Sequence, residues 1–178
     1  TSIGDDAFSG CSGLTSVTIG NSVTSIGESA FDRCSKLTKT NYTGDIAGWC
    51  NIKFGNYSAN PMRHSRNFYI NDQEIKDLVI PNGVDTINNC AFYYCSGLTS
   101  VTIPNSVTSI GSGAFSGCSD LTDVYCYAEE VPSTKSDAFA DSYVEYATLH
   151  VPDASIEDYK VTTPWSGFGT IVGLSGDM

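Results

Sequence analysis

The chain repeats itself with a period of about 23 residues, and this repeat constrains its fold more than any other feature of the sequence. A unit of this length cannot bury its own apolar residues, so neighbouring units must stack and share one continuous core. We therefore predict a solenoid that occupies the whole chain, 1–178, as a single domain. A chain of this length is expected to form one domain. Four clear repeats span 1–22, 23–42, 84–106 and 107–130, and a degenerate fifth spans 131–152.

Within each repeat, one segment has the pattern of a strand. Leu98, Val101 and Ile103 follow the spacing L-x-x-L-x-L, which is that of a leucine-rich repeat strand. The alternation at the end of this pattern is typical of a strand with one face on a core. Equivalent strands of stacked repeats lie about 4.8 Å apart, so we expect them to form a parallel sheet.

The remainder of each repeat leads the chain to the next strand. Residues 107–110 form a second extended piece, which Gly111 closes. Ala114, Phe115 and Cys118 then have the spacing of one face of a single helical turn. The predicted fold class is therefore α/β, a right-handed leucine-rich repeat solenoid with short parallel strands and short helical turns.

An enlarged coil, residues 43–83, interrupts the repeats between the second and third copies. Within it, residues 68–75 have the pattern of a strand, a two-residue turn and a second strand. Residues 75–80 then rejoin the strand pattern of the repeats. We expect one enlarged coil from which a hairpin projects.

The last segment, residues 153–178, departs from the repeat as well. We expect it to cover the open core of the final coil, as a terminal cap must. Residues 156–161 have the pattern of a helix capped by Asp153 or Ser155, and a final strand is expected at 170–172.

The repeated pattern S-I-G-x-x-A-F-x-x-C-x-x-L-x-x-V-x-I-P closely resembles the BspA-type leucine-rich repeat of surface and secreted proteins from gut and oral bacteria. The resemblance covers the four clear repeats, about half of the chain, and departs from the pattern at Thr40, Tyr42 and 88–90. It implies adhesion to host matrix, mucosal components or other bacteria, an extracellular or cell-surface location, and no catalytic activity. The family has no fixed ligand-binding motif, so the resemblance assigns no site residues.

The chain is acidic, with 9 Lys+Arg, 20 Asp+Glu and a formal net charge of −11. This balance argues against a nucleic-acid partner, because binding to phosphates needs a basic face. No apolar run approaches the roughly 18 residues of a membrane span, and the first residues lack the features of a signal peptide. We therefore expect no membrane insertion by this fragment. Since Thr1 starts part-way through a repeat unit, we also expect further chain upstream.

The seven cysteines fall into two groups. One group recurs at a single repeat position and predicts a ladder whose Cβ vectors run parallel into the core, so we expect buried free thiols rather than disulfides. Cysteines outside the ladder leave a disulfide open as an alternative. The ladder consists of Cys11, Cys34, Cys95 and Cys118; the others are Cys50, Cys90 and Cys126, with Cys90–Cys126 and Cys90–Cys95 as the alternative bridges.

Catalytic and metal-binding patterns are weak in this sequence. Zinc would need a second pair beside Cys90 and Cys95, and none follows. Cys50 with His64, or a serine with His150, would supply the residue types of a hydrolase but no recognised motif. We expect no metal and no cofactor, and we interpret the C-terminal acidic residues as a solvated surface rather than a calcium site. These residues are Asp120, Asp123, Glu129, Glu130, Asp137 and Asp141.

The outward-facing positions of the strands are the main candidate for binding, because curved solenoids use their concave strand face to bind partners. The alternative is that the Ser and Thr residues there only keep the sheet soluble. The predicted face consists of Ser16, Thr18, Lys39, Asn41, Asp77, Val79, Ser100, Thr102, Asp123 and Tyr125.

The enlarged coil is a second candidate, because its aromatic residues are denser than those elsewhere. They are Trp49, Phe54, Tyr57, Phe68 and Tyr69, of which we expect Trp49 and Phe68 to fill the core of that coil.

The leading hypothesis is a monomeric, non-enzymatic binding module that recognises a host or bacterial protein or glycan. The alternative is a structural spacer that holds another domain away from the cell, and a hydrolytic enzyme is the least favoured hypothesis.

Overall fold

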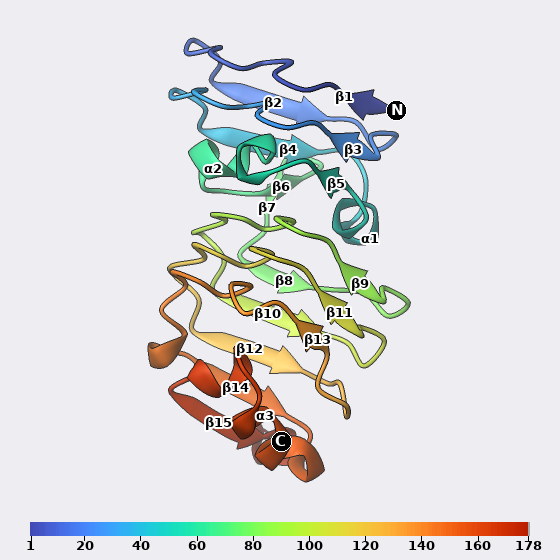
Figure 1. Ribbon diagram of the computed structural model, residues 1–178, viewed down its shortest axis with the longest axis vertical. Helices are drawn as coiled ribbons and strands as arrows, with labels where there is room; N and C mark the ends of the chain where they lie inside the picture. Colours follow the sequence, from blue (N-terminus) through green and yellow to red (C-terminus); the bar gives the residue numbers. More distant parts are fainter. Residues whose placement is uncertain (178) are drawn as a thin grey trace.

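The computed structural model describes residues 1–177 and shows a stack of coils held together by parallel strands (Figure 1). The N-terminus and the C-terminal segment lie at opposite ends of the stack (Figure 1). Two sheets on one side contain all the strands of three or four residues, together with the two-residue strands β6 and β7. The first sheet contains β2 (Ser16–Ile19), β4 (Lys39–Tyr42), β6 (Tyr69–Ile70) and β7 (Gln73–Glu74); the second contains β8 (Asp77–Val79), β10 (Ser100–Ile103), β12 (Asp123–Cys126), β14 (Thr148–Val151) and β15 (Thr170–Gly173).

Two-residue strands form a second pair of sheets on another side of the coils. They come from the second extended piece of each repeat, as the sequence predicts. The first of these sheets contains β1 (Ser2–Ile3), β3 (Ser25–Ile26) and β5 (Lys53–Phe54); the second contains β9 (Thr86–Ile87), β11 (Ser109–Ile110) and β13 (Ser133–Thr134).

The register of the strands reproduces the sequence repeat. Ser100 lies opposite Asp77 on one side and Asp123 on the other, each exactly one repeat period away along the chain. Val101 of the same strand is buried against Leu78 and Val124, while Ser100 and Thr102 are half-buried on the outer face. The predicted alternation of inward and outward residues is therefore confirmed.

The segment after each two-residue strand forms a series of tight turns. Cys95 N–H donates to Phe92 O at 3.1 Å within its own coil, whereas Phe92 N–H donates to Ala114 O of the next coil at 2.8 Å. The same bond joins Phe115 to Ala138 at 2.8 Å. These turns place the Ala, Phe and Cys side chains in the core, and alternate N–H groups join one coil to the next.

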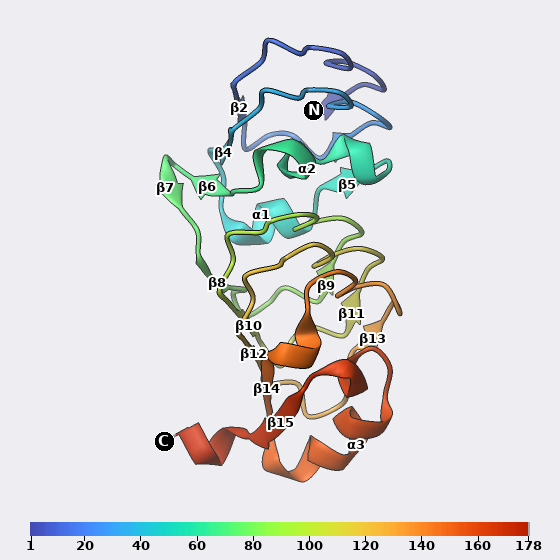
Figure 2. The same cartoon turned by 90° about the vertical axis from the view of Figure 1, so that its left-hand side faces the viewer.

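The interruption between the second and third repeats contains one extra coil. β5 pairs with β3, with Lys53 opposite Ser25, and β6 pairs with β4, with Tyr69 opposite Asn41, so this coil is longer than a regular repeat. Its added length forms two short helices and a 3₁₀ turn, and Figure 2 shows β6 and β7 extending away from the stack. These elements are α1 (Ile46–Cys50), η1 (Tyr57–Ala59) and α2 (Met62–Ser65).

The predicted hairpin is confirmed as β6 and β7, which pair antiparallel. Its two turn residues, Asn71 and Asp72, have φ values of 48° and 66°. Positive φ at both positions is the geometry of a type I′ turn, in which Asn and Asp are favoured.

The core of the extra coil is filled by Trp49 and Phe68, as predicted, and both are completely buried. Their ring centroids lie 4.7 Å apart, and the centroid of the Phe68 ring lies 5.9 Å from that of Phe92 in the following coil. Phe92 and Phe115 then stack at 5.4 Å in the regular repeats. Aromatic packing thus continues from the enlarged coil into the repeats that follow it.

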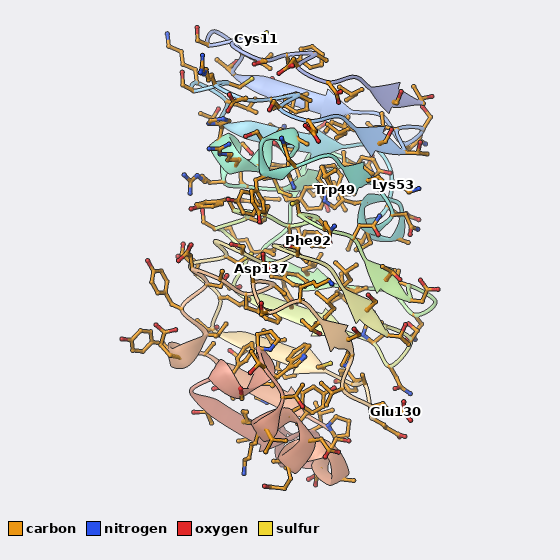
Figure 3. All side chains as sticks on the ribbon, in the orientation of Figure 1. Cys11, Trp49, Lys53, Phe92, Glu130 and Asp137 are labelled. Carbon is orange, nitrogen blue, oxygen red and sulfur yellow. The ribbon has the colours of Figure 1, made fainter. Side chains whose placement is uncertain are left out.

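The cysteine ladder is confirmed in part. Cys34, Cys95 and Cys118 are buried, but Cys11 is exposed, because its coil forms the outer end of the stack (Figure 3). The prediction that Cys11 is buried is therefore wrong. All seven cysteines lie within residues 1–177 and are free thiols, so neither alternative bridge from Cys90 is formed.

The C-terminal segment closes the other end of the stack. Its helix α3 (Ile156–Val161) and strand β15 lie where the sequence predicts them. Ser155, one of the two predicted caps, is the N-cap residue of α3, but neither side chain caps the helix: Ser155 Oγ donates to Glu129 O at 2.6 Å, and the Asp153 carboxylate accepts from Ser175. Its other elements are the 3₁₀ turns η3 (Asp153–Ser155), η4 (Trp165–Gly167) and η5 (Leu174–Asp177), and η2 (Val144–Tyr146) precedes β14.

Candidate functional site

The outward side chains of the five-stranded sheet form two rows, which we call the strand face. The strand register places equivalent residues beside one another at the spacing of adjacent strands, about 4.8 Å. Six of the predicted residues are brought together in this way: Asp77, Val79, Ser100, Thr102, Asp123 and Tyr125. One row consists of Asp77, Ser100, Asp123, Thr148 and Thr170, and the other of Val79, Thr102, Tyr125, His150 and Val172.

A cluster of Asp123, Tyr125 and His150 lies near the middle of the strand face. His150 Nε2 is 2.9 Å from Asp123 Oδ1, and the His150 ring stacks on Tyr125 with centroids 4.2 Å apart and planes 13° apart. Asp123 Oδ2 also accepts a hydrogen bond from Thr122 Oγ1 at 2.9 Å. The cluster therefore presents a carboxylate and an aromatic ring that are held in place before any ligand binds.

Sequence analysis missed His150 as part of this face and considered it only as a catalytic residue. The signal was present, because Leu149 and Val151 align with the inward residues of the earlier strands. That alignment places His150 at the outward position beside Tyr125, where it is only 7% exposed.

The outward residues of β2 and β4 do not join the strand face, because β7 ends their sheet. Ser16 and Thr18 are exposed on this separate sheet, and Lys39 forms an ion pair with Asp72 at 2.7 Å. Asn41 is 4% exposed, and its Oδ1 accepts from Asp72 N–H at 2.8 Å. The prediction that Asn41 lines a binding face is therefore wrong, since the turn of the hairpin folds over it.

The aromatic residues of the enlarged coil are mostly unavailable for binding. Trp49, Phe54 and Phe68 are buried, and Tyr69 is half-buried under the Lys39 ammonium, 4.9 Å from its ring centroid. Tyr57 is the exception, since it is exposed while it stacks on Tyr93.

A family model for the BspA type leucine-rich repeat region, with 6 copies, matches residues 1–61 and 63–161. The chain belongs to the BspA type leucine-rich repeat family. The matched residues include four of the five strands of the strand face, β8, β10, β12 and β14, and all of the extra coil except residue 62.

Three solved structures are similar to this BspA type repeat region. A leucine-rich repeat protein of T. pallidum has 24% identity, covering 97% of this chain and 62% of its own, with a TM-score of 0.39. A leucine-rich cell surface protein of Faecalibacterium prausnitzii has 21% identity and a TM-score of 0.39, and the match covers 97% of this chain and 63% of that protein. A leucine-rich repeat protein of Eubacterium ventriosum has 18% identity and a TM-score of 0.34, and the match covers 98% of this chain and 70% of that protein. The chain thus spans less than two thirds of the first two, and no curated protein matches it.

The cysteine considered as a nucleophile does not fit that role. Cys50 is completely buried, and this burial, followed by the nearby Asp45 carboxylate, raises the pKa of its thiol to about 12. A nucleophilic cysteine needs a thiolate, so Cys50 is inert near neutral pH. Burial also lowers the pKa of His64, the other residue considered for this pair.

The acidic residues of the C-terminal third do not gather into a metal site. Within residues 1–177, no three His, Cys, Asp or Glu side chains are placed to hold a metal ion. Asp120, Glu129, Glu130 and Asp141 are exposed, while Asp137 accepts from Ser112 Oγ at 2.7 Å.

Within residues 1–177, no helix is both long enough and apolar enough to cross a membrane.

Proposed function

We propose that this repeat region is a non-enzymatic binding module of a bacterial cell-surface or secreted protein. It recognises a host or bacterial protein or glycan through the strand face, with Asp123 and Tyr125 at the centre of the contact and the buried His150 holding both in place. The observation that carries this proposal is the Asp123–Tyr125–His150 cluster.

Two physical features support the proposal. A tyrosine that is already stacked loses little conformational entropy on binding, and aromatic residues on rigid scaffolds are favoured at interfaces. The Asp123 carboxylate offers an acceptor for sugar hydroxyls or for the donors of a protein, and its position on β12 is set by the parallel register with β10 and β14.

The test is a binding panel of extracellular-matrix proteins, mucins and a glycan array at physiological salt. The double variant Asp123→Ala with Tyr125→Ala should lose about a hundredfold in affinity for any ligand that binds the wild type. The matched control is Ser16→Ala with Thr18→Ala, which removes two exposed outward residues from the separate N-terminal sheet and should bind normally.

Circular dichroism and thermal unfolding would establish that each variant is folded. A ligand that binds the double variant as well as the wild type would show that the strand face is not the contact. Failure of the folded wild type to bind any member of the panel would favour the spacer alternative.

A further inference from the structure

A pocket of about 610 Å³ opens where the two main sheets separate. The C-terminal end of β4 leads into α1 on one side of this pocket, the hairpin β6–β7 contributes a second side, and β8 contributes a third. Apolar side chains make up most of its surface, namely Ile46, Ile70, Ile75, Val79 and Pro81.

The pocket continues along the molecule into a second hollow of about 510 Å³, because Val79 and Pro81 line both. Thr102, Pro104 and Tyr127 extend the lining beyond β8. Val79 is 51% exposed and Tyr127 is 46% exposed, so both present apolar surface to solvent. We call the two hollows together the sheet-break groove.

One wall of the sheet-break groove is an edge strand. β8 is the terminal strand of its sheet and pairs with β10 alone among residues 1–177. Ile80 N–H donates to Thr102 O at 2.9 Å, and Lys76 O accepts from Ser100 N–H at 3.4 Å, so these residues of the β8 segment face β10. Because backbone groups alternate in direction along a strand, the N–H and C=O groups of Asp77 and Val79 face the open edge.

The charges around the groove are mainly acidic. Asp45 lines the pocket, and Glu74 and Asp77 are exposed on β7 and β8. Lys76 lies between them and is the basic residue of the segment from 70 to 81. The whole chain adds a net charge of −11, so both the local and the overall charge favour a cationic ligand.

We propose that the sheet-break groove binds an extended, basic peptide segment of a partner protein. The peptide adds a strand to the open edge of β8 through main-chain hydrogen bonds with Asp77 and Val79. Every second side chain enters the apolar pocket, and lysine or arginine residues between them meet the acidic rim. Strand addition of this kind takes its affinity from the main chain and its specificity from the side-chain pockets.

The proposal does not depend on the function proposed for the strand face. The two sites adjoin and share Asp77, Val79 and Thr102, but the strand-face proposal is centred on β12 and β14, whereas this one is centred on the open edge of β8. The variants that test the two sites are also different, so the failure of one leaves the other standing.

The direct test measures binding of a blocked synthetic peptide of alternating lysine and valine by fluorescence anisotropy, using the whole chain. Val79→Pro removes the N–H that faces the open edge and leaves the bonds to β10 in place, so it should weaken binding about tenfold or more. The matched control Val79→Thr keeps the N–H and a β-branched side chain and should bind within about threefold of wild type.

Two further peptides test the proposal without any change to the protein. Replacing each lysine by glutamate should abolish binding, because the rim is acidic. Methylating the backbone nitrogens along one edge of the peptide should also abolish it, because those groups could no longer pair with β8. Methyl NMR shifts on binding of the unmodified peptide should centre on Ile46, Ile70, Ile75 and Val79.

Several results would overturn the proposal. They include no saturable binding of the lysine–valine peptide, equal binding of the glutamate or methylated peptide, and NMR shifts centred on the Asp123 cluster. A concentration-dependent dimer that Val79→Pro abolishes would assign the edge of β8 to a second copy of this chain instead.

Discussion

Residues at one repeat position share a backbone geometry but differ in their surroundings. Cys34 Sγ lies 3.2 Å from Phe8 O of the preceding coil, and Cys118 Sγ lies 3.4 Å from Phe92 O in the same way. Cys11 occupies the equivalent position in the outermost coil and is exposed. The chemistry of a repeated residue therefore depends on the coils stacked on either side of it.

Thiol labelling should distinguish Cys11 from the other six cysteines. We expect one fast-reacting thiol per native chain with an aromatic disulfide reagent at neutral pH, because Cys11 alone is exposed. All seven should react in denaturant, and Cys11→Ser should remove the fast phase. A second fast thiol in the native chain would contradict this assignment.

Alkaline pH should destabilise the fold through the buried thiols. Burial raises the pKa of Cys50 and Cys118 to about 12 and that of Cys90 to about 11, from an ordinary value of 9.0. A folded-state pKa above the unfolded one gives stability that is fully present below pH 9 and is lost as pH rises toward 11 or 12. The free energy of unfolding should fall by about 1 kcal/mol per pH unit for each such thiol.

Urea unfolding between pH 8 and pH 10.5 measures this loss. Cys118→Ala should reduce the slope of the unfolding free energy against pH by the share of one thiol, because Cys50 and Cys90 remain, and Cys11→Ser should leave the slope unchanged because that thiol is exposed. An unfolding free energy that stays constant above pH 9 would refute the prediction.

At the scale of elements, the extra coil is joined to the following repeats by buried side chains and two separate main-chain bonds instead of a strand ladder. The main-chain bonds run from Asn88 N–H to Cys50 O at 3.2 Å and from Gly97 N–H to Arg66 O at 3.3 Å. β5 and β9 belong to separate sheets, so their backbones do not pair. Trp49 Nε1 donates to Ala91 O at 2.6 Å, and Asn60 Nδ2 donates to Cys90 O at 2.7 Å and to Ala91 O at 3.2 Å. Two buried side chains thus bond to Ala91 O, whereas the equivalent carbonyl of Ala114 accepts from Phe92 N–H of the preceding coil.

Asn60→Ala should destabilise the junction between the extra coil and the third repeat. The change removes the acceptor of the Met62 N–H at 2.9 Å and one donor to the carbonyls of Cys90 and Ala91, which costs about 1–3 kcal/mol of unfolding free energy. The exposed Asn82 provides a matched control, since Asn82→Ala should change stability by less than about 0.5 kcal/mol. Chemical denaturation measures both, and equal effects would argue against the bridging role of Asn60.

The C-terminal cap shows how far an element can be predicted. The apolar pattern and polar start of 156–161 are local, and they predicted α3 with its observed bounds. Ser155 takes the N-cap position, one of the two predicted alternatives, but neither its side chain nor that of Asp153 caps the helix, because they bond to Glu129 and Ser175 instead. A local pattern can indicate that a helix forms, but not which partner its capping residues choose.

At the scale of the whole molecule, stability is a sum over neighbouring coils, because each coil contacts mainly the coils next to it. The C-terminal end is closed by Trp165, which is completely buried with its ring centroid 5.2 Å from Phe139 and 5.4 Å from Tyr159. A destabilising substitution at this end should therefore lower the stability of the nearest coils most and that of distant coils least.

Trp165→Ala should cost about 3–5 kcal/mol and loosen the C-terminal coils first. Hydrogen exchange should show lost protection in β14 and β15 while β2 and β4 keep theirs, because the two groups of strands lie in different sheets. A uniform loss of protection along the chain would contradict the nearest-neighbour description.

About half of the strand face could be predicted from the sequence. Asp123 and Tyr125 lie at outward positions of a clear repeat, so the period of two placed them correctly. His150 belongs to the degenerate fifth copy, which is longer than the clear repeats and pairs Tyr125 with His150. Its place beside Tyr125 follows from aligning Leu149 with Val124, but the ring stacking and the contact with Asp123 are geometry that only the folded strands define.

The sequence by itself determined the solenoid, the parallel register of its regular repeats and which side chains face the core, because a short repeat can bury its apolar residues only by stacking on its copies. The tertiary structure decided the features at which the repeat stops: the burial of Asn41, the exposure of Cys11 and the groove beside Val79. Each of these depends on where a hairpin or a chain end lies relative to segments distant in sequence, and no local period encodes such a distance.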